Sequence, residues 1–142
     1  MTRMIFVNLP VADLEKSKAF YESLGFTNEP RFTDETAACM VLSETIHVML
    51  LTHDKWKTFT SRPIPSVDSS EVMLCVNCET KDEVNQLADT AGARGGIADV
   101  NPVQDHGFMF SRSFTDLDGH IWETMWMDPA VAAGEAEVPE IA

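Results

Sequence analysis

The feature that most constrains the fold is a repeated order of predicted elements. In the first half, an apolar strand-like run over residues 4–11 is followed by a helical pattern that stops at Gly25 and then by three more strand-like segments. The second half repeats this order, with a strand at 71–76, a helix that begins after the N-cap Thr80 and a stop at Gly92. Two β-α-β-β-β units in tandem predict an α+β fold with internal structural duplication.

The spacing of turn residues predicts the remaining strands and the boundaries of two modules, a connector and a tail. The remaining strands are predicted at 27–33, 37–42, 46–51, 97–103, 108–114 and 120–127. We therefore assign one domain to residues 1–128. Its first module covers residues 4–51, its connector residues 52–70 and its second module residues 71–127. The connector loses apolar periodicity and gains proline and serine, and residues 129–142 are predicted to form an acidic C-terminal tail.

Charge narrows the range of partners. The 142 residues include 10 basic and 23 acidic ones, which gives a net charge of −13. This balance argues against nucleic acid and against anionic membrane surfaces as partners. No apolar run approaches the ~18 residues that a membrane span needs, and the N-terminal residues lack a signal-peptide pattern. Together with only three cysteines, these features predict a cytoplasmic protein.

Two segments resemble a known superfamily. The opening VNLPVADLEKSKAFYESLGF and the later FTDLDGHIWETMWMDP are similar to the first strand and helix and to the last hairpin of the vicinal oxygen chelate superfamily. Its members include glyoxalase I, bleomycin-resistance proteins, fosfomycin-resistance proteins and extradiol dioxygenases. The resemblance implies two curled sheets around an open cavity, in which metal-containing members hold neighbouring oxygens of the substrate.

The resemblance also implies positions for metal ligands, on the first and last strand of each module. In this chain those positions fall on Phe6, near Leu50, on Glu71 and on Glu123. Phenylalanine and leucine cannot ligate a metal, so two of the four expected ligands are present. The resemblance therefore leaves two alternatives, a weakly held divalent metal at Glu71 and Glu123 or no metal.

The two glutamates are also the candidate catalytic residues. Strand alternation places Glu71 and Cys75 on one face of their strand, and we expect that face to line the cavity. If Glu123 lies within a few ångströms of Glu71 without a metal, one of the two carboxyl groups retains a proton and can act as a general acid or base. The alternative is that Glu123 is solvated at the rim of the cavity.

Five residues are predicted to line the substrate site. They are Asn8, Phe6, Leu50, Trp56 and Arg112. The amide of Asn8 would bind a substrate oxygen, Trp56 would form a cavity wall, and Arg112 would pair with a substrate carboxylate or with Glu123.

The C-x-x-C match at Cys75 and Cys78 is not expected to bind zinc or form a redox pair. The first cysteine lies within a predicted strand and the second at its end, so the two side chains point to opposite faces.

Two functions from different classes remain open. The first is a glyoxalase-like lyase or a related cavity enzyme that acts on a small oxygen-rich substrate, with Glu123 as the proton-transfer group. The second is a metal-free binding protein of the bleomycin-resistance type, which the acidic charge balance favours because an acidic cavity suits a cationic ligand. Either would be a homodimer that binds a small molecule.

Overall fold

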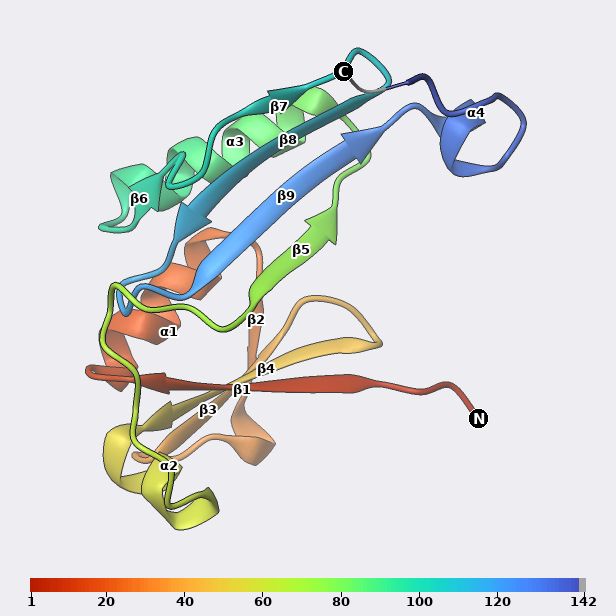
Figure 1. The fold of residues 1–142 in the computed structure, drawn as a ribbon. Coiled ribbons are helices and arrows are strands. Elements are labelled where there is room, and N and C mark those ends of the chain that lie inside the picture. The colour runs from red at the N-terminus through yellow and green to blue at the C-terminus, as the bar shows by residue number, and fades with distance from the viewer. Residues whose placement is uncertain (141–142) are drawn as a thin grey trace. The chain divides into compact units, whose positions relative to one another are not determined.

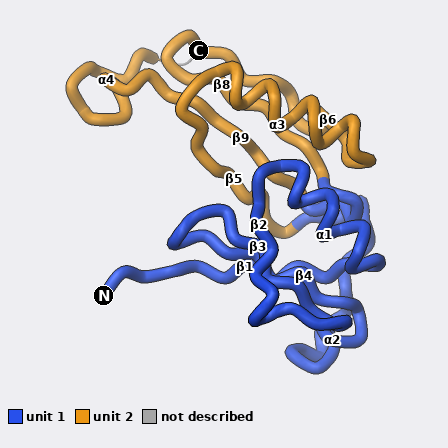
Figure 2. The backbone as a smooth tube through the Cα atoms, turned by 180° about the vertical axis from the view of Figure 1, so that it is seen from behind, with its two compact units in different colours: residues 1–70, 116–120 blue, residues 71–115, 121–142 orange. Residues whose placement is uncertain are grey.

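A computed structural model describes residues 1–140, and its chain divides into two compact units (Figure 2). Unit 1 comprises residues 1–70 together with the short segment 116–120. Unit 2 comprises residues 71–115 and the chain from residue 121 onward. The connector at 52–70 is therefore part of unit 1, and so is the turn at 116–120.

Unit 1 contains a four-stranded mixed sheet with helices packed against it (Figure 1). Its elements are β1 (Ile5–Val11), α1 (Leu14–Ser23), β2 (Thr27–Glu29), the 3-10 helix η1 (Pro30–Phe32), β3 (Ala37–Val41), β4 (Ile46–Thr52) and α2 (His53–Phe59). The strand order is β1-β4-β3-β2, with β1 parallel to β4 and the other pairs antiparallel.

The sequence signals at the ends of α1 act as predicted. The Asp13 side chain accepts a hydrogen bond from the Lys16 backbone N–H and so caps the first turn. Gly25 follows the last turn at a φ of +93°, the left-handed conformation in which many helices end. The apolar stripe of α1, which includes Phe20 and Tyr21, is buried against β3 and β4.

Unit 2 repeats the arrangement. Its elements are β5 (Met73–Asn77), α3 (Lys81–Ala93), β6 (Ile97–Ala98), β7 (Gln104–Asp105), β8 (Met109–Thr115), β9 (Ile121–Met127) and α4 (Pro129–Ala132). The order β5-β9-β8-β6 has the pattern of unit 1, with the first strand parallel to the last. Figure 1 shows α3 along one side of β8 and β9, and the predicted repetition of the β-α-β-β-β order is confirmed.

Several predicted strands are shorter than expected because local chemistry interrupts them. Pro30 begins the 3-10 turn η1 where the pattern over residues 27–33 predicts a continuing strand. In unit 2, Asp99 adopts a φ of 56°, so the segment predicted at 97–103 leaves the ladder after Ala98.

Two short helices lie where the sequence predicts irregular chain. In the connector, the Thr52 hydroxyl accepts from the Lys55 N–H and starts α2. In the tail, Asp128 accepts from the Ala130 N–H and Pro129 occupies the first turn of α4. Within residues 1–140, no helix has the length and apolar character needed to cross a membrane.

Candidate functional site

In unit 1, one face of the sheet is covered by α1 and the other is partly open. Register pairs Phe6 with His47 and Asn8 with Met49, so these four side chains share one face of β1 and β4. We name this set of four residues the open face of unit 1. Phe6 and Asn8 are exposed, whereas His47 and Met49 are half-buried.

An aromatic pair dominates this open face. The rings of Phe6 and His47 stack with centroids 4.6 Å apart and an interplanar angle of 18°. Phe6 remains 50 % exposed, so one side of the stacked pair faces solvent. His47 Nδ1 is shielded from solvent and has no hydrogen-bond partner among the described residues. The pair therefore offers a ring surface for stacking and a polar atom that an incoming group can satisfy.

Trp56 of α2, like His47, has a buried ring nitrogen without a hydrogen-bond partner among the described residues. Helix α2 packs against β1 and β4, on the side of β1 opposite to α1 in Figures 1 and 2. The indole Nε1–H of Trp56 is buried and finds no acceptor among residues 1–140. The structure thus places the expected cavity-wall residue on a helix that the sequence did not reveal.

Leu50 lies away from this face. Its register partner on β1 is Leu9, and both are on the face covered by α1, where Leu50 is fully buried. Leu50 therefore lies in the hydrophobic core, and the structure does not bring it together with Phe6.

In unit 2, Glu123 lies on the face of the sheet opposite to α3. It is paired in register with Cys75 on β5 and with Ser113 on β8, and it is half-buried. We name the set Cys75, Glu123, Ser113 and Met125 the open face of unit 2. Burial, and then the negative charge of Glu123, raise the pKa of the Cys75 thiol.

The structure does not bring Glu71 and Glu123 together. Glu71 is exposed and precedes the first residue of β5 by two positions. Cys75, four residues further along, occupies the position beside Glu123, and four residues of extended chain span roughly 13 Å. A shared proton between the two carboxyl groups requires a much shorter separation.

Arg112 lies on the other face of β8, toward α3. Its register partner is the buried Thr124, and its guanidinium bonds Asp99 at 2.9 Å and Asp89 at 3.0 Å. A further hydrogen bond of 3.0 Å goes to Asn85 Oδ1 on α3. The hydrogen bond from Arg112 lowers the pKa of Asp99, and the bond to Asp99 raises the pKa of Arg112. The Arg112 guanidinium therefore binds residues within unit 2, and it does not contact Glu123 or face a substrate site on the opposite side of the sheet.

The residues present do not fit the four-ligand metal site that the resemblance implies. Phe6 has no donor atom, Leu50 faces α1, and Glu71 lies outside its strand. Among the described residues, no three His, Cys, Asp or Glu side chains converge on one point. We therefore derive no reaction step through a metal of that kind.

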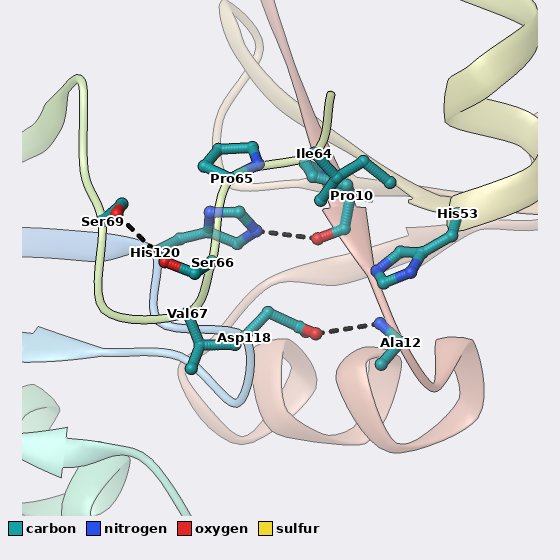
Figure 3. Close-up of a pocket in the computed structure, with 10 residues that line it drawn as sticks. All are labelled: Pro10, Ala12, His53, Ile64, Pro65, Ser66, Val67, Ser69, Asp118 and His120. Atoms are coloured by element: carbon teal, nitrogen blue, oxygen red, sulfur yellow. Dashed lines mark hydrogen bonds between the residues drawn. The ribbon is translucent and has the colours of Figure 1, made fainter. Parts of the chain in front are cut away.

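The connector forms a separate pocket of about 90 Å³ in unit 1, shown in Figure 3. Two hydrogen bonds fix its walls, one of 2.8 Å between the His120 ring Nε2 and the Pro10 carbonyl oxygen and one of 2.8 Å from the Ala12 N–H to Asp118 Oδ1. His53 borders the same pocket from the start of α2.

The turn at this pocket is anchored by a buried carboxyl group. Asp116 is 3 % exposed and accepts hydrogen bonds from the Tyr21 hydroxyl and from the backbone N–H groups of Asp118 and His120. Burial raises the pKa of Asp116. The resemblance of the segment FTDLDGHIWETMWMDP implies a hairpin here, but the sequence carries no signal that its turn would bind β1 and α1.

Comparisons with known proteins agree with this fold. A family model described as bleomycin resistance protein-like N-terminal matches residues 3–43. A hypothetical protein from S. aureus is 27% identical, with a TM-score of 0.74 over 89% of this chain and 95% of that one. A search of curated proteins finds no match.

More distant structures share the fold alone. A glyoxalase-related enzyme from Fulvimarina pelagi is 22% identical with a TM-score of 0.73, over 89% of this chain and 88% of that one. A genomically encoded fosfomycin resistance protein from Listeria monocytogenes is 16% identical with a TM-score of 0.64, over 99% of this chain and 96% of that one. The fold and the match over residues 3–43 are consistent with the resemblance to the vicinal oxygen chelate superfamily.

Proposed function

We propose that this protein binds a small, planar, cationic organic molecule on the open face of unit 1, without a four-ligand metal. The observation that carries the proposal is the stacked pair Phe6–His47, in which an exposed ring lies against an imidazole whose Nδ1 is shielded and unpartnered within residues 1–140. A planar ligand stacked on Phe6 would add aromatic contact and bring a polar group to His47. The exposed amide of Asn8 supplies a further donor and acceptor on the same face.

The net charge of the chain and its family-model match both support a cationic ligand. The net charge of −13 produces a negative potential that concentrates cations near the protein. The bleomycin resistance protein-like match covers residues 3–43, which include Phe6 and Asn8. An aromatic ring face also attracts a cation directly.

The test is a binding titration with matched variants. Wild type is titrated with bleomycin, with the planar cation proflavine and with the anion fosfomycin, and binding is followed by ligand fluorescence or calorimetry. Phe6→Ala should weaken binding of a planar cation about tenfold, the effect of losing one aromatic stacking contact and its buried area. The control is Phe32→Ala, which removes a similarly exposed ring elsewhere in unit 1. Equal affinity in wild type and Phe6→Ala, or preference for the anion, contradicts the proposal.

A glyoxalase-like lyase is the second candidate, and Glu123 is the observation that favours it. This carboxylate lies on a sheet face that no helix of unit 2 covers, beside the thiol of Cys75 and the hydroxyl of Ser113. A half-buried carboxylate in such surroundings can accept a proton from a carbon next to a carbonyl.

The lyase candidate has its own test. Activity is measured on a panel of 2-oxoaldehydes with and without glutathione, and with and without added divalent ions. Glu123→Gln should abolish any turnover without lowering the melting temperature, because a carboxylate without a cationic partner adds little stability. Glu71→Gln should keep activity, since Glu71 lies outside β5, two residues before its first residue, whereas Cys75 is the residue beside Glu123. Turnover that survives Glu123→Gln rules out this role.

A further inference from the structure

The pocket in unit 1 that Figure 3 shows is lined by three segments that are distant in the sequence. They are the end of β1 with the loop that follows it, the connector, and the turn at 116–120. The pocket volume of about 90 Å³ holds roughly six to nine water molecules, at ~10–15 Å³ for each. A molecule of about five to eight non-hydrogen atoms therefore fits, and the pocket shares no residue with the open face of unit 1.

Three side chains of this lining have already used the protons that they could donate. The Ser66 hydroxyl donates to Asp68 Oδ1 at 2.6 Å, so the Ser69 hydroxyl, 3.0 Å away, donates to Ser66 Oγ. His120 Nε2 lies 2.8 Å from the carbonyl oxygen of Pro10. Because a carbonyl oxygen can only accept, this nitrogen carries the proton of the neutral ring. These side chains therefore offer a ligand no further donor while His120 is neutral.

The unused polar groups of the pocket are acceptors. With Nε2 protonated, the neutral His120 ring keeps a lone pair on Nδ1. Asp118 Oδ1 accepts from the Ala12 N–H at 2.8 Å, and Oδ2 has no hydrogen-bond partner among the described residues. Within residues 1–140, no Lys or Arg forms an ion pair with Asp118, and none lines the pocket. The pocket is thus rich in acceptors and carries an uncompensated negative charge.

The rest of the lining is largely apolar. The connector contributes Ile64, Pro65 and Val67, and β1 contributes the buried Pro10. The two prolines have no backbone N–H and so add no donor. Hydrocarbon groups of a ligand would displace water from these surfaces. The pocket is therefore complementary to a molecule with N–H donors at one end and a short hydrocarbon body.

We propose that this pocket binds a small primary ammonium ion with a short alkyl body, held by the Asp118 carboxylate and by His120 Nδ1. An ammonium group has three donors and no acceptor, which matches a pocket whose free groups accept. Its hydrogen bond to Asp118 is charge-assisted, and the net charge of −13 concentrates cations near the protein. An anion of the same size would be repelled by Asp118, and an alcohol would bring one donor in place of three.

The site is separate from the one proposed on the open face of unit 1. That face offers an exposed aromatic ring to a planar cation, whereas this pocket offers acceptors and aliphatic walls to a small alkylammonium ion. Failure of either proposal leaves the other intact.

The experiment is a titration of the full chain with butylammonium, followed by proton–nitrogen correlation NMR. The Ala12 amide reports on the site directly, because its N–H bonds Asp118 in the pocket wall. We expect a saturable shift of this amide with a dissociation constant of about 1 mM, which five non-hydrogen atoms can supply. Butyrate and 1-butanol, which have the same number of carbon atoms, should bind at least about tenfold more weakly.

Matched variants separate local recognition from the overall charge. Asp118→Asn keeps an oxygen for the Ala12 N–H but removes the charge, and it should weaken butylammonium binding about tenfold. Glu44→Gln removes one charge from the exposed turn at the other end of β4, and it should leave the affinity unchanged. Circular dichroism checks the fold of both variants, and mass spectrometry checks that the new amide before Gly119 has not hydrolysed.

A variant of the apolar wall tests the alkyl part of the proposal. Ile64→Ala should weaken butylammonium about fourfold, the effect of about one buried CH₂ group, and should leave methylammonium unchanged. Three results overturn the proposal: no saturable shift of the Ala12 amide up to about ten times the expected dissociation constant, equal affinity for butylammonium and butyrate, or Asp118→Asn no weaker than Glu44→Gln.

Discussion

At the scale of single residues, Gly119 is a position where unit 1 does not tolerate a side chain. Its φ is +85°, and a Cβ atom there would overlap the carbonyl oxygen of Val67 in the connector. The connector can pack against the turn at 116–120 only because this residue has no side chain.

We predict that Gly119→Ala destabilises the protein by about 3 kcal/mol or more, from overpacking added to backbone strain. Gly107→Ala is the control, since Gly107 has a φ of +79° but an added Cβ would meet no atom within 4 Å. It should cost only about 1 kcal/mol. Urea unfolding of the two variants measures the difference, and equal losses would show that the contact with Val67 is unimportant.

Asp116 predicts a pH dependence of stability with a defined sign. Burial raises its pKa in the folded state, whereas in the unfolded chain the value is about 3.9. As pH rises above that value, the unfolded state ionises first, so the folded state loses stability until its own carboxyl group has ionised. Asp116→Asn cannot ionise and should therefore gain stability relative to wild type over this range.

The measurement is the unfolding free energy of wild type and Asp116→Asn at a series of pH values from about 3 upward. The other titrating groups are common to both proteins and cancel in the difference. If the difference in unfolding free energy between the two proteins stays constant with pH, or if wild type becomes relatively more stable as pH rises, the raised pKa of Asp116 is contradicted.

At the scale of elements, Arg112 joins β8, α3 and the segment after β6. Its side chain is 12% exposed and bonds Asp89 on α3 and Asp99 in the loop, where Asp99 holds its left-handed backbone conformation. Removal of the guanidinium leaves these carboxylates without their cationic partner.

We predict that Arg112→Leu lowers the unfolding free energy by about 2 kcal/mol, less than a fully buried pair would lose because its partners are partly exposed. Arg31→Leu, which breaks the exposed ion pair with Glu29, should cost less than about 1 kcal/mol. In double-mutant cycles, we expect a measurable interaction energy between Arg112 and Asp99. We expect none between Arg112 and Glu123, because Glu123 lies on the opposite face of the sheet. A strong coupling between Arg112 and Glu123 would refute that placement.

At the scale of the whole molecule, β1 is an edge strand with an apolar and accessible first half. It lies at one end of the order β1-β4-β3-β2, and Met4, Ile5 and Phe6 are each at least 50 % exposed. An unprotected apolar edge of this kind favours pairing with another chain.

We therefore predict a homodimer that uses this edge, with a mass in solution twice the chain mass of 15.8 kDa. Ile5→Lys should shift the protein toward the monomer, because a charge at a sheet edge opposes strand pairing. Val138→Lys, at an exposed apolar residue of the tail, should have no such effect. Light scattering coupled to size exclusion measures all three proteins, and a monomeric wild type would contradict the prediction.

The sequence by itself determined the duplicated order of elements, because its signals are local. The Asp13 cap, the Thr80 cap and the glycine stop after α1 act within a few residues of the helix ends, and both helices begin where these caps predict. The stop predicted at Gly92 is wrong, because α3 continues to Ala93 and the left-handed glycine that follows it is Gly95.

Only the tertiary structure decided which side chains share a face. A shift of one residue in strand register exchanges the two faces of a sheet, and the register is fixed only when strands that are distant in the sequence pair and bury one face together. For this reason Leu50 lies under α1, Arg112 lies toward α3, and Cys75 rather than Glu71 lies beside Glu123. The stacking of His47 on Phe6 likewise arises from the parallel pairing of β1 with β4, two strands separated in sequence by a helix and two further strands.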